Sequence, residues 1–252
     1  MLTIGSVHAA DLATTAALHR EHLALGLFPR LGDQFLRQYH ASFIESPYGI
    51  ALAARDRGRL AGVLFGTTSN PDHYRWTLRN HGWTLAWRGG LALLTRPMLA
   101  WTFAKTRLGR YASGINRCLT PPQPGPARAQ GPPVAVLNHI VTDVGDRGRG
   151  VGRRLVDELK KRARASGIER IRLVTPAGGP GRPFFERLGA ERIADRRETD
   201  GKLIHEYHFR LDHGVRPMPV PAAIQRHEPV RAQRARQGAL ANARRPLVGN
   251  PR

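Results

Sequence analysis

The sequence is short of cysteine, of long apolar runs and of acidic residues. Cys118 is the single cysteine in 252 residues, which excludes an internal disulfide and a zinc cluster built from cysteines. We interpret it as a small buried residue. No uninterrupted apolar stretch reaches about 18 residues, so no membrane-spanning helix is expected. The opening stretch MLTIGSVHAADLATT has neither the basic nor the apolar segment of a secretion signal. These absences predict a cytoplasmic protein, and we expect no metal site.

Acidic residues are also unevenly placed. The chain has 19 of them against 40 lysines and arginines, for a formal net charge of +21. Between Asp72 and Asp143 there are nine basic residues and no acidic one, a net charge of +9. Residues 213–252 carry eight arginines against Glu228 alone, a net charge of +7. Most of the positive charge therefore belongs to an insert and a C-terminal tail rather than to the whole surface.

Apolar periodicity predicts the order of elements in the first half of the chain. We expect two helices, a β-hairpin, a basic and aromatic helical insert, and a proline-rich linker, at residues 8–25, 31–45, 49–69, 70–120 and 121–133. Gly89-Gly90 and Pro97 interrupt the insert, which argues against one long helix there.

The second half predicts an alternation of strands and helices. We expect a buried strand, a helix, a second strand, a short helix in RPFFERLG and a final strand in HEYHFRL, the first three at residues 134–144, 151–166 and 168–175. This pattern indicates one α/β domain over residues 1–212, with a twisted mixed sheet flanked by helices. Residues 213–252 lack bulky core formers, and we expect them to be a disordered basic tail.

The stretch DRGRGVGRRL, residues 146–155, joins the buried strand to the long helix. The first amides of a helix have no partner within it, and a helix N-terminus carries about half a positive charge. Gly148, Gly150 and Gly152 let a ligand approach those amides. Four arginines, Arg147, Arg149, Arg153 and Arg154, add charge that can bind phosphate oxygens. The loop therefore predicts a pyrophosphate site.

Two common phosphate-binding patterns do not fit this loop. A mononucleotide P-loop needs a lysine after its glycines, and none follows here. The dinucleotide pattern needs a third glycine at position 153, which is an arginine.

A third pattern does fit. RGRGVG, with Arg147, Gly150 and Gly152, resembles the R-x-x-G-x-G signature of the GNAT acetyltransferases, and FFERLGA resembles that family's F-Y-x-x-x-G-F block. The resemblance covers roughly residues 1–67 and 134–211. It implies a GNAT-like acyl-CoA N-acyltransferase fold with a helical insert. It also implies an N-acetyltransferase that uses acetyl-CoA as co-substrate.

The resemblance also implies a set of site residues. Backbone amides from Arg147 to Arg153 would hold the pyrophosphate, and the pantetheine arm would run beside the preceding strand. The implied cofactor-binding residues are Val141, Thr142, Asp143, Arg147, Gly148, Arg149, Gly150, Val151, Gly152, Arg153 and Phe185. A backbone N–H near Ile140 to Thr142 would stabilise the developing oxyanion.

His139 is the candidate general base, because its position on the strand places it beside the thioester and its ordinary pKa of about 6.5 suits proton transfer. The alternative is a histidine hydrogen-bonded within the sheet, and Asp143 is a weaker candidate. The family's tyrosine acid is replaced by Phe185, and its asparagine and its final phenylalanine by Gly178 and Ala190. Tyr207, Tyr111 or solvent can supply the proton instead.

The insert, which contains all four tryptophans, allows three interpretations. It can pack on the domain, cover the acceptor as a lid, or lie on an anionic membrane through residues 74–111.

The acceptor is expected to be a small-molecule primary amine such as an amino sugar or another anionic amine. The competing functions are a catalytically silent acyl-CoA-binding module and a basic protein that binds nucleic acid or a membrane surface. For the tail we expect weak, non-specific nucleic-acid contact, and the oligomeric state is left open.

Overall fold

The computed structural model describes residues 1–23, 27–106, 109, 112, 113, 116, 133–197 and 201–211. Residues 1–213 form one compact unit. The expected linker at residues 121–133, apart from residue 133, lies outside the described residues. So do the expected tail at residues 213–252, Cys118 and Tyr111.

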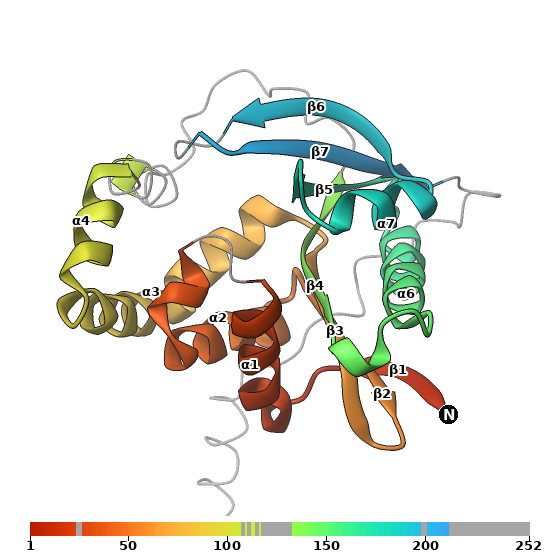
Figure 1. Ribbon diagram of the computed structural model, residues 1–252, viewed down its shortest axis with the longest axis horizontal. Helices are drawn as coiled ribbons and strands as arrows, with labels where there is room; N and C mark the ends of the chain where they lie inside the picture. Colours follow the sequence, from red (N-terminus) through yellow and green to blue (C-terminus); the bar gives the residue numbers. More distant parts are fainter. Residues whose placement is uncertain are drawn as a thin grey trace, which may run out of the picture. The chain divides into compact units, whose positions relative to one another are not determined.

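Seven strands form one mixed sheet in the order β1-β2-β3-β4-β5-β7-β6 (Figure 1). In chain order they are Leu2–Ser6, Gly49–Asp56, Arg59–Thr67, Val134–Thr142, Arg170–Pro176, Glu191–Arg197 and Leu203–Arg210. Every neighbouring pair is antiparallel except β4 and β5, which are parallel. The β2–β3 hairpin turns at Arg57 and Gly58, whose φ angles of 50° and 81° suit a tight two-residue turn.

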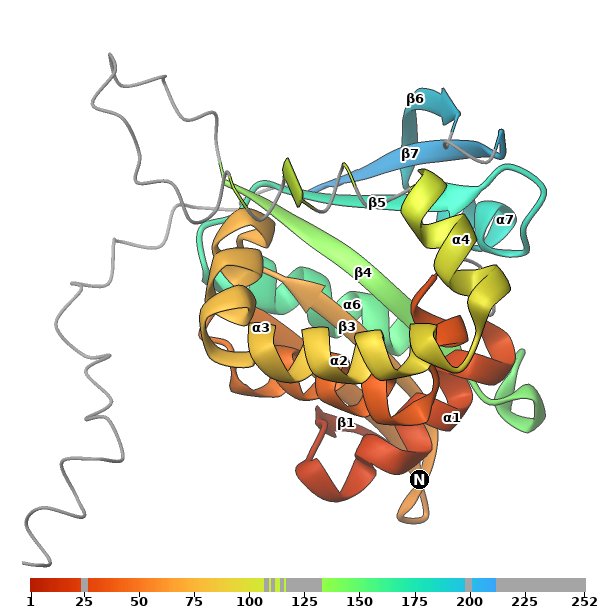
Figure 2. The ribbon, with the colours of Figure 1, turned by 90° about the vertical axis from the view of Figure 1, so that its left-hand side faces the viewer.

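Helices cover both faces of the sheet (Figures 1 and 2). The α-helices are α1, Leu12–His22; α2, Asp33–Glu45; α3, Asn70–Leu94; α4, Pro97–Thr106; α6, Val151–Ala165; and α7, Gly181–Arg187. Short 3-10 turns are η1, Ala9–Asp11; η2, Phe28–Leu31; and η3, Val144–Asp146. None of the helices described is both long and apolar enough to cross a bilayer.

Side chains of the central strands point alternately to the two faces of the sheet, and this alternation decides which helices each side chain contacts. Leu52 and Leu64 point toward α6 and join a core that includes Leu155 and Leu159. Their neighbours in the chain point the other way, and Phe65 joins a second core with Leu18 of α1 and Phe43 of α2. Strands buried on both faces account for the near-continuous apolar runs in the sequence.

β4 and β5 pair only at their beginnings. Val134–Leu137 lies beside Arg170–Leu173, and after Leu137 the two strands have no further paired residues among those described. The separation of the strands opens the sheet on the side where α6 begins. This opening positions the candidate site.

Most expected elements are confirmed, and the fold is the expected mixed α/β one with a helical insert. The edge strands β1 and β6 were not predicted, because most of their residues are exposed or half-buried and show no apolar pattern. The expectation that Gly89-Gly90 interrupts the insert is wrong, since α3 continues through both glycines. Gly89 packs against the Phe35 ring of α2, so tertiary contact outweighs its low helix propensity.

Candidate functional site

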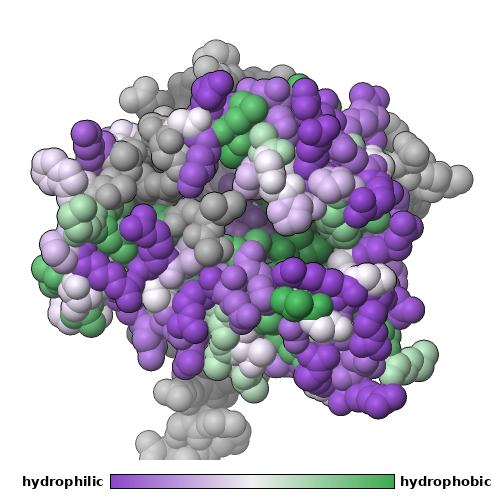
Figure 3. Space-filling model, viewed as in Figure 1, coloured by the Kyte–Doolittle hydropathy of each residue, from purple (hydrophilic) through white to green (hydrophobic). Residues whose placement is uncertain are grey.

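A cavity of about 850 Å³ lies where β4 and β5 separate. Its walls come from the end of β4, the end of β5, the loop that opens α6, and α7. α1 and η2 close it on the other side of the sheet. Figure 3 shows it as a hollow with a hydrophobic floor between α1 and α7.

The loop after β4 presents backbone N–H groups to this cavity. Among the described residues, the amides of Gly148, Gly150, Val151, Gly152 and Arg153 donate no hydrogen bond, whereas those of Arg147 and Arg149 donate to the carbonyls of Val144 and Asp146. Unpartnered amides at the start of a 15-residue helix attract an anion. Of the seven amides from Arg147 to Arg153 that were expected to hold the pyrophosphate, two are already used within the loop.

Glycine is required at two positions of this loop by conformation and at a third by packing. Gly148 and Gly150 have φ angles of 77° and 78°, in the left-handed region that side chains with a Cβ rarely adopt. A Cβ at Gly152 would lie 3.0 Å from the Phe184 ring of α7. The glycine at position 152 thus lets the aromatic side of the cavity pack against the first turn of α6.

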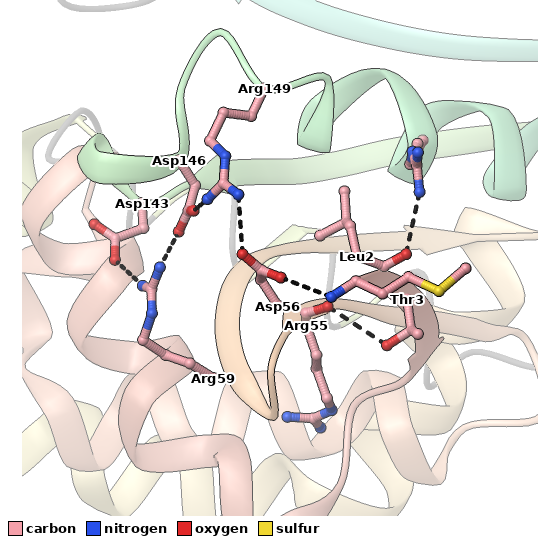
Figure 4. Close-up of polar contacts among 10 residues, drawn as sticks. Leu2, Thr3, Arg55, Asp56, Arg59, Asp143, Asp146 and Arg149 are labelled. Carbon is pink, nitrogen blue, oxygen red and sulfur yellow. Dashed lines mark hydrogen bonds and ion pairs between the residues drawn. The ribbon is translucent and has the colours of Figure 1, made fainter.

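A network of ion pairs holds the loop against the β2–β3 hairpin (Figure 4). Asp146, which is 1% exposed, accepts hydrogen bonds from Arg59 at 2.5 Å and from Arg149 at 2.6 Å. Arg149 also reaches Asp56 at 3.0 Å, and Arg59 reaches Asp143 at 2.8 Å. Because each guanidinium bridges two carboxylates, the network fixes the loop in position against the hairpin.

The structure separates the expected cofactor-binding residues into two groups. Lining the cavity are Val141, Thr142, Arg147, Gly148, Gly150, Val151, Gly152, Arg153 and Phe185. Asp143 and Arg149 are not among its lining residues, since their side chains belong to the ion-pair network. Arg154 likewise donates to the carbonyl of Leu2, so Arg149 and Arg154 hold the loop and β1 in place rather than facing a ligand.

The backbone of β4 offers further groups to the cavity. Asp143 N–H donates to the Ala61 carbonyl of β3, and β4 pairs with β3 in register at Thr142 and Val141. Because backbone groups alternate in direction along a strand, the N–H and C=O of Ile140 and Thr142 face the side where β5 has diverged. These are the polar groups that an extended ligand would meet there.

His139 lines the cavity and is half-buried. Its Nε2 atom lies 2.9 Å from the Tyr39 hydroxyl of α2. Burial, followed by the neighbouring His19, lowers the pKa of His139 from 6.5 to about 3. The imidazole is therefore neutral at neutral pH.

A second imidazole, His19 of α1, also lines the cavity, with its ring centroid 4.7 Å from that of His139. Its Nδ1 atom lies 3.0 Å from Nε2 of His40, and His40 Nδ1 lies 3.0 Å from the Thr15 hydroxyl. Burial lowers the pKa of His19 to about 4 and that of His40 well below its ordinary value. The described residues provide no hydrogen-bond partner for His19 Nε2.

Tyr207, one of the two tyrosines considered as proton donors, lies outside the cavity. Tyr207 is fully buried, its hydroxyl donates to Glu186 at 2.8 Å, and it is absent from the cavity lining. Burial, followed by that hydrogen bond, raises the pKa of Tyr207. Among the described residues that line the cavity there is no tyrosine.

Sequence reasoning missed three contributors to the site. Tyr39 and His19 lie on helices whose apolar faces indicated only core packing, and both come into contact with His139 through tertiary structure. Asp146 was assigned no role from the sequence, yet it anchors the loop. The sequence TTAALHREH offered one indication of His19, because it places this histidine on the buried face of the predicted helix, near its end. Within the part of the chain that the structure describes, no group of three histidine, cysteine or acidic residues is arranged to hold a metal ion.

Residues 19–190 match the model of the Acetyltransferase (GNAT) family. The fold is similar to that of an N-acetyltransferase from Staphylococcus aureus Mu50, with 11% identity, 84% of this chain and 99% of that chain covered, and a TM-score of 0.51. It is also similar to yncA from Salmonella typhimurium, solved with its cofactor acetyl-CoA, with 12% identity, coverage of 87% and 99%, and a TM-score of 0.50. A third similar structure is Ard1 from Thermoplasma volcanium, with 12% identity and a TM-score of 0.50. The match covers 84% of this chain and 98% of that chain. No curated protein matches the chain significantly.

Proposed function

The chain belongs to the GNAT family of acetyltransferases, and from this we propose that it transfers an acetyl group from acetyl-CoA to a primary amine by direct attack within a ternary complex. One observation carries the proposal. Five unpartnered amides at the start of α6 lie on the wall of a cavity that continues between β4 and β5. Such amides suit the pyrophosphate of coenzyme A.

Arg147 and Arg153 support the same placement, because both are exposed cavity-lining residues that can pair with phosphate oxygens. The pantetheine arm would extend along β4 and hydrogen-bond with the backbone of Ile140 and Thr142. This arrangement resembles the addition of a strand to an open sheet edge. Phe184 and Phe185 would pack against the arm from α7.

We propose His139 as the general base. An ammonium group cannot attack a carbonyl, so the amine must lose a proton, and a neutral imidazole in the cavity wall can accept it. The Tyr39 hydroxyl would orient the ring through its 2.9 Å hydrogen bond. A backbone N–H of Ile140 or Thr142 would stabilise the negative charge on the carbonyl oxygen. With no tyrosine in the described cavity lining, water would protonate the leaving thiolate.

The acceptor is proposed to be a small amine that also carries a negative charge, such as an amino sugar phosphate or an amino acid. Three arginines line the cavity, Arg147, Arg153 and Arg187. Asp146 is the one carboxylate among the described lining residues, and two guanidiniums already neutralise it. Because Arg147 and Arg153 would pair with the phosphates of coenzyme A, the positive charge that remains among the described lining residues for an anionic acceptor is that of Arg187.

A catalytically silent acyl-CoA-binding module is the second candidate. It is favoured by Phe185 at the position of the expected tyrosine and by the low pKa of His139, which makes the imidazole a weak base. A cytoplasmic location and weak nucleic-acid contact through residues 213–252 remain predictions.

The test uses two glycines at opposite ends of α6. Gly150 and Gly167 have left-handed φ angles of 78° and 70°, and a Cβ would meet nothing within 4 Å at either position. Alanine at either position should therefore lower the free energy of unfolding by a similar amount, about 1 kcal/mol. Only Gly150 lines the cavity. We expect Gly150→Ala to weaken acetyl-CoA binding about tenfold in calorimetric titration, whereas Gly167→Ala leaves the affinity unchanged.

The proposal is abandoned if the wild type binds neither coenzyme A nor acetyl-CoA, or if both variants bind with wild-type affinity. Wild-type binding without acetylation of any amine in a broad panel would favour the silent module instead.

A further inference from the structure

An apolar stripe runs along the outer face of α3 and continues onto α4. On α3 it consists of Trp83, Trp87, Leu91 and Leu94, whose spacing of four, four and three residues places them on one face. Their exposed fractions are 81%, 65%, 55% and 82%. On α4, Met98 and Trp101 are 77% and 69% exposed. We call these six residues the outer stripe.

This arrangement is the reverse of an ordinary surface helix, which turns its polar side chains outward. The opposite face of α3 places His73, Thr77 and His81 against the domain. The inward face of α4 is already satisfied, since Leu99 and Phe103 pack with Leu31 and Phe35. The outer stripe is therefore additional to what the core needs. Figure 3 shows hydrophobic side chains at the edge of the molecule where α3 meets α4.

Only positive charges accompany the outer stripe. α3, α4 and the two residues between them carry Arg75, Arg79, Arg88, Arg96 and Lys105, and the one acidic residue of this segment is Asp72 in the first turn of α3. Arg88 and Arg96 donate to backbone carbonyls of Gln34 and Arg30, which neutralises neither. Arg79 and Lys105 are exposed and have no ion pair among the described residues.

We propose that the outer stripe docks onto an anionic lipid surface. Indole rings prefer the boundary between lipid headgroups and acyl chains, and arginine and lysine beside them pair with anionic headgroups. A second copy of this chain fits less well, because the contact would bring two sets of cations together. With no acidic residue between His73 and Thr142, neither copy supplies a carboxylate from this segment.

α4, which carries part of the outer stripe, is connected to the cavity through η2. η2 packs on α4 through Leu31 and Leu99, and its residues Phe28 and Pro29 line the cavity. Docking would thus place the wall of the cavity that η2 forms one helix away from the lipid surface.

The tryptophans provide a direct readout, because all four lie in α3 and α4. The full-length protein is mixed with vesicles of phosphatidylcholine alone or with about one third phosphatidylglycerol. We expect sedimentation with the anionic vesicles and a shift of tryptophan emission to shorter wavelength. The basic tail can also attract anionic vesicles, but binding through the tail would leave the emission unchanged.

The test variant is the triple substitution Trp83→Ser, Trp87→Ser and Trp101→Ser, which keeps the tail and the half-buried Trp76. The control is Ile193→Ser, which removes a 50% exposed apolar side chain from β6. We expect the triple variant to lose at least about tenfold in vesicle partitioning with an unchanged circular dichroism spectrum, and the control to bind as wild type.

The proposal fails if the wild type shows no emission shift with anionic vesicles, or if the triple variant partitions as well as the wild type. It also fails if the wild type is a stable dimer that the triple variant dissociates and vesicle binding is absent.

Discussion

At the scale of single residues, the proposed general base is a neutral imidazole beside a tyrosine hydroxyl. His139 is held at 2.9 Å from Tyr39, and its pKa of about 3 keeps it unprotonated. A base that is neutral throughout the working range is available at every pH, although it accepts a proton less readily than an ordinary histidine.

We expect His139→Asn to lower kcat about 100-fold, because the amine then loses its proton only to water. Tyr39→Phe should lower it less, about fivefold, since the ring is retained and only its orientation is loosened. Thiol release from acetyl-CoA measures both. The wild-type kcat/KM should rise with pH up to the pKa of the amine itself. An acid limb centred near 6.5 would contradict a buried, neutral His139.

Asp146 and Asp143 give a matched pair for testing the anchoring of the loop. Asp146 is fully buried and pairs with two arginines, whereas Asp143 is half-buried and pairs with Arg59 alone. Asp146→Asn should lower the thermal unfolding midpoint by about 3 °C and raise the KM for acetyl-CoA severalfold, because charge-assisted hydrogen bonds weaken. Asp143→Asn should change both quantities less. Equal effects would mean that burial of the carboxylate is unimportant.

At the scale of elements, the two adjacent glycines of α3, Gly89 and Gly90, differ in their surroundings. Gly90 is exposed and a Cβ there would meet nothing within 4 Å, whereas a Cβ at Gly89 would lie 3.6 Å from the Phe35 ring. Gly90→Ala should raise the free energy of unfolding by about 0.5–1 kcal/mol, since alanine loses less backbone entropy in a helix. Urea denaturation measures the change. Gly89→Ala should raise the free energy of unfolding by less. A lower free energy of unfolding in Gly90→Ala would show that α3 is not helical at this position in solution.

The elements that the sequence predicted best are those whose burial imposes a pattern. α6 shows it most clearly, with Val151, Leu155 and Leu159 buried at intervals of four. β1 and β6 escaped prediction because edge strands with exposed side chains carry no such pattern. The length of α3 escaped because local propensity argued for a break at Gly89-Gly90, and packing on α2 overruled it.

At the scale of the whole molecule, three buried histidines and the half-buried His139 link stability to pH. Burial, and for some of them the charge of a neighbouring histidine, lowers the pKa of His19, His73 and His139 to about 4, 4 and 3, and that of His40 well below 6.5. The unfolded chain therefore binds protons that the folded protein rejects. Stability is complete above about pH 6.5 and declines as the pH falls toward 4, on the order of 1.4 kcal/mol per pH unit for each histidine.

His73 offers a test away from the cavity, because it packs between α2 and α3 against Phe43. His73→Gln removes one proton-linked group, so the free energy of unfolding should fall less steeply below pH 6, whatever its value at pH 7.5. Urea denaturation at pH 7.5, 6.5 and 5.5 gives the slope. An unchanged slope would mean that His73 titrates alike in the folded and unfolded chains.

The sequence by itself determined the glycine-rich loop, its helix and the strand before it, because these features are local. Glycines with left-handed backbone, unpartnered amides and apolar periodicity all arise within about 30 consecutive residues, 134–163. It also placed His139 on the strand that lines the cavity.

Only the tertiary structure decided which side chains share that cavity. Arg149 and Arg153 look alike in the sequence, yet one is bound by Asp146 and Asp56 while the other faces the cavity. His19 and Tyr39 meet His139 because α1 and α2 pack on the same face of the sheet, about 100 residues away along the chain. The physical reason is that hydrogen bonding and burial depend on distance in space, which local sequence patterns do not encode.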